Sequence, residues 1–105
     1  MMKLGMSELE RIARFFRAFS EPTRLALLQE LKGGEKSVNA LVEAVDTTQA
    51  NVSKQLKMLH DEGLLKRRRD GNQVMYSIAE PMVIELCELA CEQLNARPKK
   101  RKLKF

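Results

Sequence analysis

The stretch that decides the fold is Gln49-Ala-Asn-Val-Ser-Lys-Gln-Leu-Lys-Met-Leu-His-Asp-Glu-Gly63. Val52, Leu56 and Leu59 recur at the spacing of one helix face, which predicts a helix over residues 49–62 with one buried row. The preceding Thr48 can cap the first turn, and the closing glycine can end the last one. The outward residues at the start of this helix are short and polar. Such a helix is typical of the second helix of a helix-turn-helix, which enters the DNA major groove.

The chain before this stretch is predicted to form three helices. Apolar residues recur on one helix face from Leu9 to Phe16. Ser20 can cap a second helix, and Gly33-Gly34 terminates it. Ser37 can cap a short third helix, Val38–Ala44, which precedes the turn of the helix-turn-helix.

The chain after Gly63 changes its period from 3.6 to 2. Residues 65–69 and 74–78 alternate, and Asp70-Gly71-Asn72 between them is typical of a turn, so a β-hairpin is expected. Pro81 begins a last helix with a broad apolar face. The predicted fold class is mainly α with a β-hairpin wing (α+β), a winged helix-turn-helix. The wide apolar stripe and acidic outer row of the last helix favour burial against a second copy.

Length and charge define one domain with a tail. The chain has 105 residues and a net charge of +5. Residues 97–105 carry six basic and no acidic side chains, so we expect a basic, disordered tail after a DNA-binding and dimerisation domain at 1–96. No run of apolar residues could span a membrane, and the first 20 residues lack a secretory signal. Two cysteines without a Cys-x-x-Cys pair fit the reducing cytoplasm.

Residues 48–76 gather the chemistry that double-stranded DNA requires. Amide side chains read adenine bidentately, hydroxyls bind phosphates or bases, and lysines and arginines neutralise phosphates. A two-stranded wing would place its basic residues against the backbone or the minor groove. The predicted DNA-binding residues are Thr48, Gln49, Asn51, Ser53, Lys54, Gln55, Lys57, Arg67, Arg68, Arg69 and Asn72.

Three segments resemble the ArsR/SmtB family of transcriptional repressors. These are Phe16-Arg-Ala-Phe-Ser-Glu-Pro-Thr-Arg-Leu-Ala-Leu-Leu28, then residues 49–65, and Arg68-Arg-Asp-Gly-Asn-Gln-Val-Met-Tyr76. The resemblance covers about residues 9–95. It implies a winged-helix homodimer, paired through its first and last helices, that blocks a promoter until an inducer or redox signal weakens DNA binding. It assigns DNA contacts to the start of the helix at 49–62, supported by the wing.

Two other classes of function remain as alternatives. A nonspecific nucleic-acid-binding or architectural protein would use the charge of the tail and the wing, with little sequence preference. An enzyme is not expected, because one histidine, no tryptophan and no glycine-rich phosphate loop offer little for catalysis.

The inducer site is not defined by the sequence. Metal sensors of the resembled family use third-helix thiols or Asp and His ligands on the last helix, and this chain has neither, so no metal site of those kinds is expected. Cys87 and Cys91 lie one turn apart on the last helix. Across a two-fold axis, two such pairs could hold a soft metal or arsenite, or form an intersubunit disulfide. The alternative is that both are small buried apolar side chains.

Overall fold

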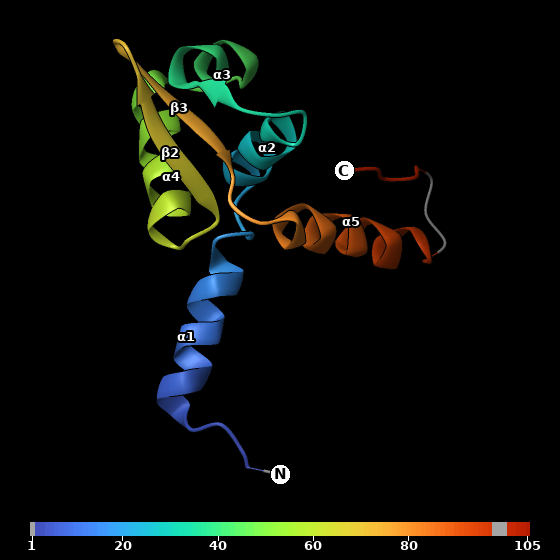
Figure 1. The fold of residues 1–105 in the computed structure, drawn as a ribbon. Helices are drawn as coiled ribbons and strands as arrows, with labels where there is room; N and C mark the ends of the chain where they lie inside the picture. Colours follow the sequence, from blue (N-terminus) through green and yellow to red (C-terminus); the bar gives the residue numbers. More distant parts are fainter. Residues whose placement is uncertain (1, 98–100) are drawn as a thin grey trace.

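The fold was examined in a computed structural model, which describes residues 2–97 and 101–105. These residues form five helices and a small antiparallel sheet. The elements are α1 (Met6–Arg17), α2 (Pro22–Leu31), β1 (Lys36–Ser37), α3 (Val38–Ala44), α4 (Gln49–Asp61), β2 (Leu65–Asp70), β3 (Gln73–Ile78) and α5 (Pro81–Asn95). The helices α2, α3 and α4 lie around the sheet, and α1 and α5 extend from it (Figure 1). This is the predicted winged helix-turn-helix, with helix ends within a few residues of those expected.

The helix starts follow from local capping. The Ser37 hydroxyl accepts from the Ala40 amide at 3.1 Å, and the Thr48 hydroxyl accepts from the Asn51 amide at 3.1 Å, as predicted. The second helix is present as predicted, but its predicted cap, Ser20, was wrong. Its cap is Glu21, whose carboxylate accepts from the Arg24 amide at 2.9 Å, whereas the Ser20 hydroxyl donates back to a carbonyl of α1. Pro22 is the first helical residue, so the residue directly before it, Glu21, takes the cap position. Its carboxylate can then accept from the unpaired amide of the first turn.

The wing is a three-stranded sheet in the order β1-β3-β2. The predicted hairpin pairs Leu65 with Ile78 and Asp70 with Gln73, which leaves a two-residue loop of Gly71 and Asn72. Gly71 has a φ of +63°, a conformation that glycine adopts without strain and that suits tight hairpin loops. The strand β1 was not predicted. Its two residues are ordered as a strand only by pairing with β3.

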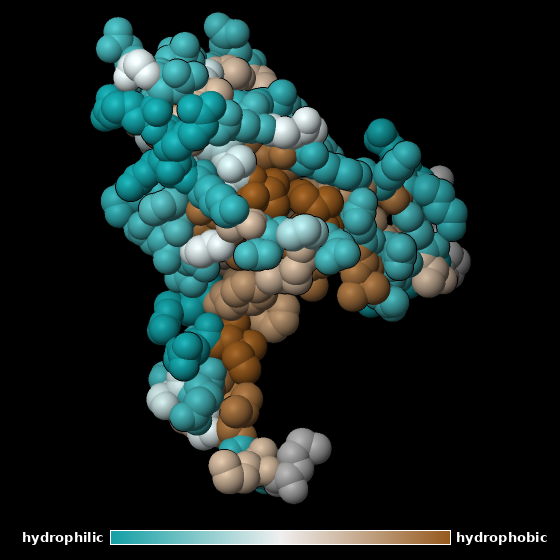
Figure 2. All heavy atoms as spheres, in the orientation of Figure 1, coloured by the Kyte–Doolittle hydropathy of each residue, from teal (hydrophilic) through white to brown (hydrophobic). Residues whose placement is uncertain are grey.

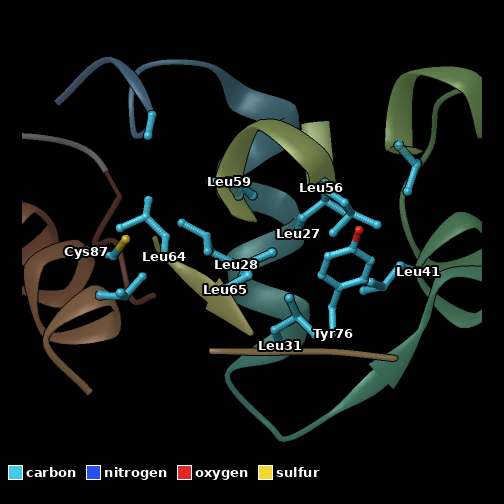
Figure 3. Packing of buried hydrophobic residues seen from close by; sticks show 13 residues of the cluster. Leu27, Leu28, Leu31, Leu41, Leu56, Leu59, Leu64, Leu65, Tyr76 and Cys87 are labelled. Carbon is cyan, nitrogen blue, oxygen red and sulfur yellow. The ribbon is translucent and has the colours of Figure 1, made fainter. Parts of the chain in front are cut away.

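A single leucine-rich core holds α4 and the wing in place. Leu27, Leu28 and Leu31 of α2 pack with the buried row of α4, Val52, Leu56 and Leu59. Figure 3 shows Tyr76 of β3 and Leu41 of α3 completing one side of this cluster, with Cys87 of α5 at the other. All of these side chains are buried. Helix α4 and the wing are therefore anchored by close packing, which resists small displacements.

Two elements keep apolar side chains outside this core. The helix α1 has no buried residue, and Leu9, Ile12 and Phe16 are 45%, 41% and 54% exposed. On α5, only Val83 and Cys87 are buried, while the apolar outer face stays open. In Figure 1 both helices project from the body, and in Figure 2 an apolar strip runs along the side of α1 that faces α5.

The end of the chain was expected to form a basic, disordered tail. Residues 98–100 lie outside the described residues. Beyond them, Asn95 of α5 exchanges two hydrogen bonds with the backbone of Leu103, both of 2.6 Å. Phe105 packs against the core, and its carbonyl accepts from Lys32 at 2.8 Å. Leu103 and Phe105 line an apolar groove of about 490 Å³ beside α5, together with apolar side chains of that helix. Within residues 2–97 and 101–105, no helix has the length and apolarity that crossing a bilayer requires.

Candidate nucleic-acid interface

The exposed face of α4 carries most of the predicted contact residues. Its outer side chains project to solvent at the N-terminal end of the helix, while Val52, Leu56 and Leu59 point into the core. Asn51 lies at the boundary between the two faces and is half-buried. The exposed residues are Thr48, Gln49, Ser53, Lys54 and Lys57. This surface offers hydroxyl, amide and ammonium groups together, which are the groups that recognise base edges and phosphates.

Gln55 does not share this exposed surface. It was predicted with the contact residues, but its side chain is only 7% exposed. Its carbonyl accepts from Arg24 of α2 at 2.8 Å, and its amide donates to Asn51 at 3.0 Å. Gln55 is thus positioned to hold Asn51 and is removed from direct reach of a duplex. Gln55 follows Val52 by three positions and so lies at the edge of the buried row of α4, and this spacing was the sequence signal for burial.

The wing presents its arginines alongside α4. Because β2 runs back along α4 after a short connection, the loop of Gly71 and Asn72 lies at the end of the molecule where α4 begins (Figure 1). A groove of about 450 Å³ between α4 and the wing is lined by Ser53 and the side chains of residues 67–69, among others. The groove therefore brings the predicted helix residue Ser53 together with the predicted wing arginines at 67–69. Arg67, Arg69 and Asn72 are exposed.

Arg68 differs from its neighbours because it is already paired. Its guanidinium donates two hydrogen bonds of 2.7 Å to the carboxylate of Glu35, the residue before β1. This hydrogen-bonded pair lowers the pKa of Glu35 and raises the pKa of Arg68. The bidentate pair fixes the side-chain direction and offsets one positive charge of the wing. Arg68 thus joins β2 to the segment that begins β1.

A second ion pair lies farther along α4. Lys57 contacts Asp61 at 2.8 Å, one turn later on the same exposed face. The hydrogen bond from Lys57 lowers the pKa of Asp61. Both side chains are largely exposed, so this pair is weak and a phosphate could take the place of Asp61.

The two thiols of α5 differ in environment. Cys87 is buried in the core and Cys91 is half-buried, and no disulfide links them. Burial, followed by the nearby Cys91 and Glu88, raises the pKa of Cys87 to about 11. The Cys87 thiol is therefore protonated at neutral pH, and it packs as a small apolar side chain. In the described part of the chain, no group of three or more His, Cys, Asp or Glu residues is placed to hold a metal ion.

The comparisons with known proteins agree with this geometry. Residues 21–67, which include α2 through α4, match the bacterial regulatory proteins of the arsR family. A probable mercury resistance operon repressor of Streptomyces lividans is 45% identical over 78 residues, covering 74% of this chain and 62% of that protein. A transcriptional repressor of Synechocystis, a homolog of SmtB, is 33% identical over 92 residues, covering 88% of this chain and 70% of that protein.

The chain belongs to the ArsR family of DNA-binding transcriptional repressors. This is the family that the sequence motifs predicted, and its members are regulators, not enzymes. A solved domain from Mycobacterium bovis, a homodimeric winged helix-turn-helix and possible ArsR-family regulator, shares the fold. Its TM-score is 0.75 at 26% identity, covering 96% of this chain and 100% of that one. The ArsR-family chain thus has a homodimeric relative of the same architecture.

Proposed function

We propose that this ArsR-family repressor binds its operator as a homodimer, with α4 of each copy in the major groove and the wing beside it. The observation that carries the proposal is the polar, exposed N-terminal end of α4, held on a packed core next to exposed arginines. Two copies related by a two-fold axis would read half-sites about 34–36 Å apart. Repression follows because such a complex occupies promoter DNA, and the protein would act where that DNA lies, in the cytoplasm.

The roles of the contact residues follow from their placement. Gln49 and Asn51 are assigned to base edges, since their amides can pair with adenine. Phosphates are assigned to the hydroxyls and ammonium groups around them, which are those of Thr48, Ser53, Lys54 and Lys57. Arg67, Arg69 and Asn72 are assigned to the duplex beside the wing. Gln55 and Arg68 are assigned positioning roles, because each is held by another side chain.

The homodimer is supported by the apolar surface that the single chain leaves open. Leu9, Ile12 and Phe16 of α1 form a continuous strip, and Leu89 and Leu94 are exposed on α5. Exposed apolar side chains that lie together on the surface of a small domain mark an interaction site. A second copy presenting the same two helices would cover it, since isologous pairing is the commonest route to a dimer.

Release by a signal at Cys87 and Cys91 is a subsidiary hypothesis. The high pKa of Cys87 opposes the thiolate that soft metals, arsenite or oxidants require. DNA-binding titrations with and without thiophilic metals and oxidants test this hypothesis. If the double variant Cys87→Ser/Cys91→Ser responds as the unaltered protein does, the thiols are not the sensor.

The proposal is tested by comparing a specific duplex with a scrambled one. A duplex selected by the protein from a randomised pool serves as the operator, and a mobility-shift titration measures both affinities. Gln49→Ala or Asn51→Ala should cost roughly 1–3 kcal/mol on the selected duplex and little on the scrambled one.

The same assay tests the alternative of a nonspecific nucleic-acid-binding protein. Binding that shows no preference for the selected duplex, and that disappears when residues 97–105 are removed, would support that alternative. A strong preference that survives removal of these residues supports the repressor.

A further inference from the structure

A chain of hydrogen bonds connects α2 with the DNA-facing end of α4. The Arg24 guanidinium donates to the Gln55 carbonyl at 2.8 Å, and the Gln55 amide donates to the Asn51 carbonyl at 3.0 Å. The Asn51 amide then donates to the Thr47 hydroxyl at 3.1 Å. The chain begins at a partly buried arginine, 31 positions before Gln55, and ends in the turn of the helix-turn-helix.

The direction of this chain is set by its first member. An arginine side chain has donors and no acceptor, whereas an asparagine or glutamine amide has both and can be turned either way. Because Arg24 can only donate, the oxygen of Gln55 must face it. The nitrogen of Gln55 then faces Asn51, which turns the oxygen of Asn51 toward Gln55 and its nitrogen toward Thr47.

Arg24 itself is fixed by the end of α1. Its Nε donates to the Ala18 carbonyl at 3.0 Å, and a terminal nitrogen donates to the Arg17 carbonyl at 2.7 Å. These carbonyls belong to the last turn and C-cap of α1, where the helix dipole favours a cation. The guanidinium therefore has three anchored donors in a rigid plane and little freedom to turn away from Gln55.

We propose that Arg24, acting through Gln55, is a specificity-determining residue that fixes the amide orientation of Asn51. After its two bonds within the chain, Asn51 keeps one N–H and one lone pair, which suffice for a bidentate contact with adenine. Turning the amide by half a rotation would exchange donor and acceptor and mismatch that base. This inference rests on the proposed function, since it assigns the base selectivity of the same helix.

The decisive variant is Gln55→Glu. The carboxylate placed there still accepts from Arg24, so the anchor at α1 is kept, but it has no donor for Asn51. Asn51 must then turn its nitrogen toward residue 55 and its oxygen toward the Thr47 hydroxyl, which can donate. Gln29→Glu is the matched control, because it adds the same charge at an exposed position of α2 that takes no part in this series of hydrogen bonds. Arg24→Met is the second variant, since it removes the donor that sets the direction.

The readout is the ratio of affinities for the selected duplex and its scrambled counterpart, because added charge weakens both alike. Gln55→Glu should lower this ratio by roughly 5- to 150-fold, the span of one good bidentate contact. Gln29→Glu should leave the ratio unchanged. In a background of Asn51→Ala, Gln55→Glu should have little further effect on the ratio, which a merely structural role would not produce.

Each outcome decides between the two proposals. If the unaltered protein shows no preference for the selected duplex, the proposed function fails. If it shows a preference that Gln55→Glu and Arg24→Met both keep, the function stands and this inference is overturned. If circular dichroism shows that a variant is unfolded, a measurement on the unaltered protein still tests the orientation of the Asn51 amide. Its Asn51 side-chain amide protons should show nuclear Overhauser effects to Thr47, and contacts to the Gln55 amide protons instead would overturn the inference.

Discussion

The helices α4 and α1 share a pattern of apolar residues but differ in what covers it. The row of α4, with Leu56 at its centre, is buried within the chain. The row of α1, with Ile12 at its centre, has the same spacing and stays exposed. An apolar helix face predicts that something will cover it, but the spacing does not say whether that cover belongs to the same chain.

The difference divides the molecule into two regions. The reading body, which comprises α2 to β3, is completed by its own core. The dimer arms, which comprise α1 and the outer face of α5, are left for a second copy under the proposed function. Substitutions in the reading body should therefore change folding or DNA contacts, and substitutions in the arms should change association.

The largest effect is expected in the core of the reading body. Leu56→Ala removes a fully buried side chain between α2 and α4 and should lower the free energy of unfolding by roughly 2–5 kcal/mol. Urea unfolding followed by circular dichroism measures the change. Lys57→Ala, the exposed neighbour, should change stability by no more than about 0.5 kcal/mol. Equal effects of the two substitutions would contradict the assignment of the core.

An arm substitution should separate association from folding. Ile12→Glu places a charge in the apolar strip and should weaken dimerisation by at least about 1–3 kcal/mol, or roughly 5- to 150-fold. Sedimentation equilibrium measures the constant, and circular dichroism should show a folded body. Arg14→Gln, on the other side of α1, is the control that changes the net charge by the same one unit. A dimer that tolerates Ile12→Glu as well as its control would refute pairing through this strip.

The thiol of Cys87 belongs to the buried part of α5. Its pKa, raised from 9.0 to about 11, leaves about a hundredfold less thiolate at pH 8 than an ordinary thiol has. Alkylation by iodoacetamide at pH 8, followed by mass spectrometry, should be at least about 100-fold slower in the native protein than in urea. Comparable rates in both states would favour the sensing hypothesis over packing.

The same shift fixes a pH dependence with a definite sign. The folded state holds the Cys87 proton more tightly than the unfolded chain, so this thiol's contribution to stability is fully present below pH 9. That contribution is lost as the pH rises through about 11. Urea unfolding of Cys87→Ser and of the unaltered protein at successive pH values should show this loss only in the unaltered protein.

The smallest effect is expected at the edge of the wing. Glu35→Gln removes the carboxylate that pairs with Arg68 and leaves a free guanidinium on the wing. Affinity for any duplex should rise slightly, and the slope of log affinity against log salt should steepen by about one. Glu43→Gln, an exposed position on α3, is the matched control. A decrease in affinity would mean that the pair's main role is to position Arg68 for DNA.

The sequence predicted the elements that depend on near neighbours. The caps at Ser37 and Thr48 and the turn at Gly71 each involve residues within a few positions, so their chemistry is visible in the order of the chain. The buried row of α4 follows from helical period alone. The apolar stripe of the last helix favoured burial against a second copy, and the resemblance to the ArsR family added pairing through the first and last helices.

Prediction failed where distant residues meet. Gln55 is of a residue type that contacts DNA bases. Only its hydrogen bonds to Arg24 and Asn51 show that it is buried and holds the Asn51 side chain. Arg68 is of a residue type that binds phosphates, but its guanidinium is hydrogen-bonded to Glu35, which is 33 positions away in the sequence. The basic composition of the tail also gave no sign of the groove that Leu103 and Phe105 line together with α5.

By itself the sequence determined where helices begin, which face of each is apolar, and that the polar start of α4 suits DNA. Only the tertiary structure decided which polar side chains reach solvent and which form hydrogen bonds with one another. The physical reason is that a hydrogen bond needs its partners within about 3 Å. For residues more than 30 positions apart, that distance is set by the packing of the leucine core.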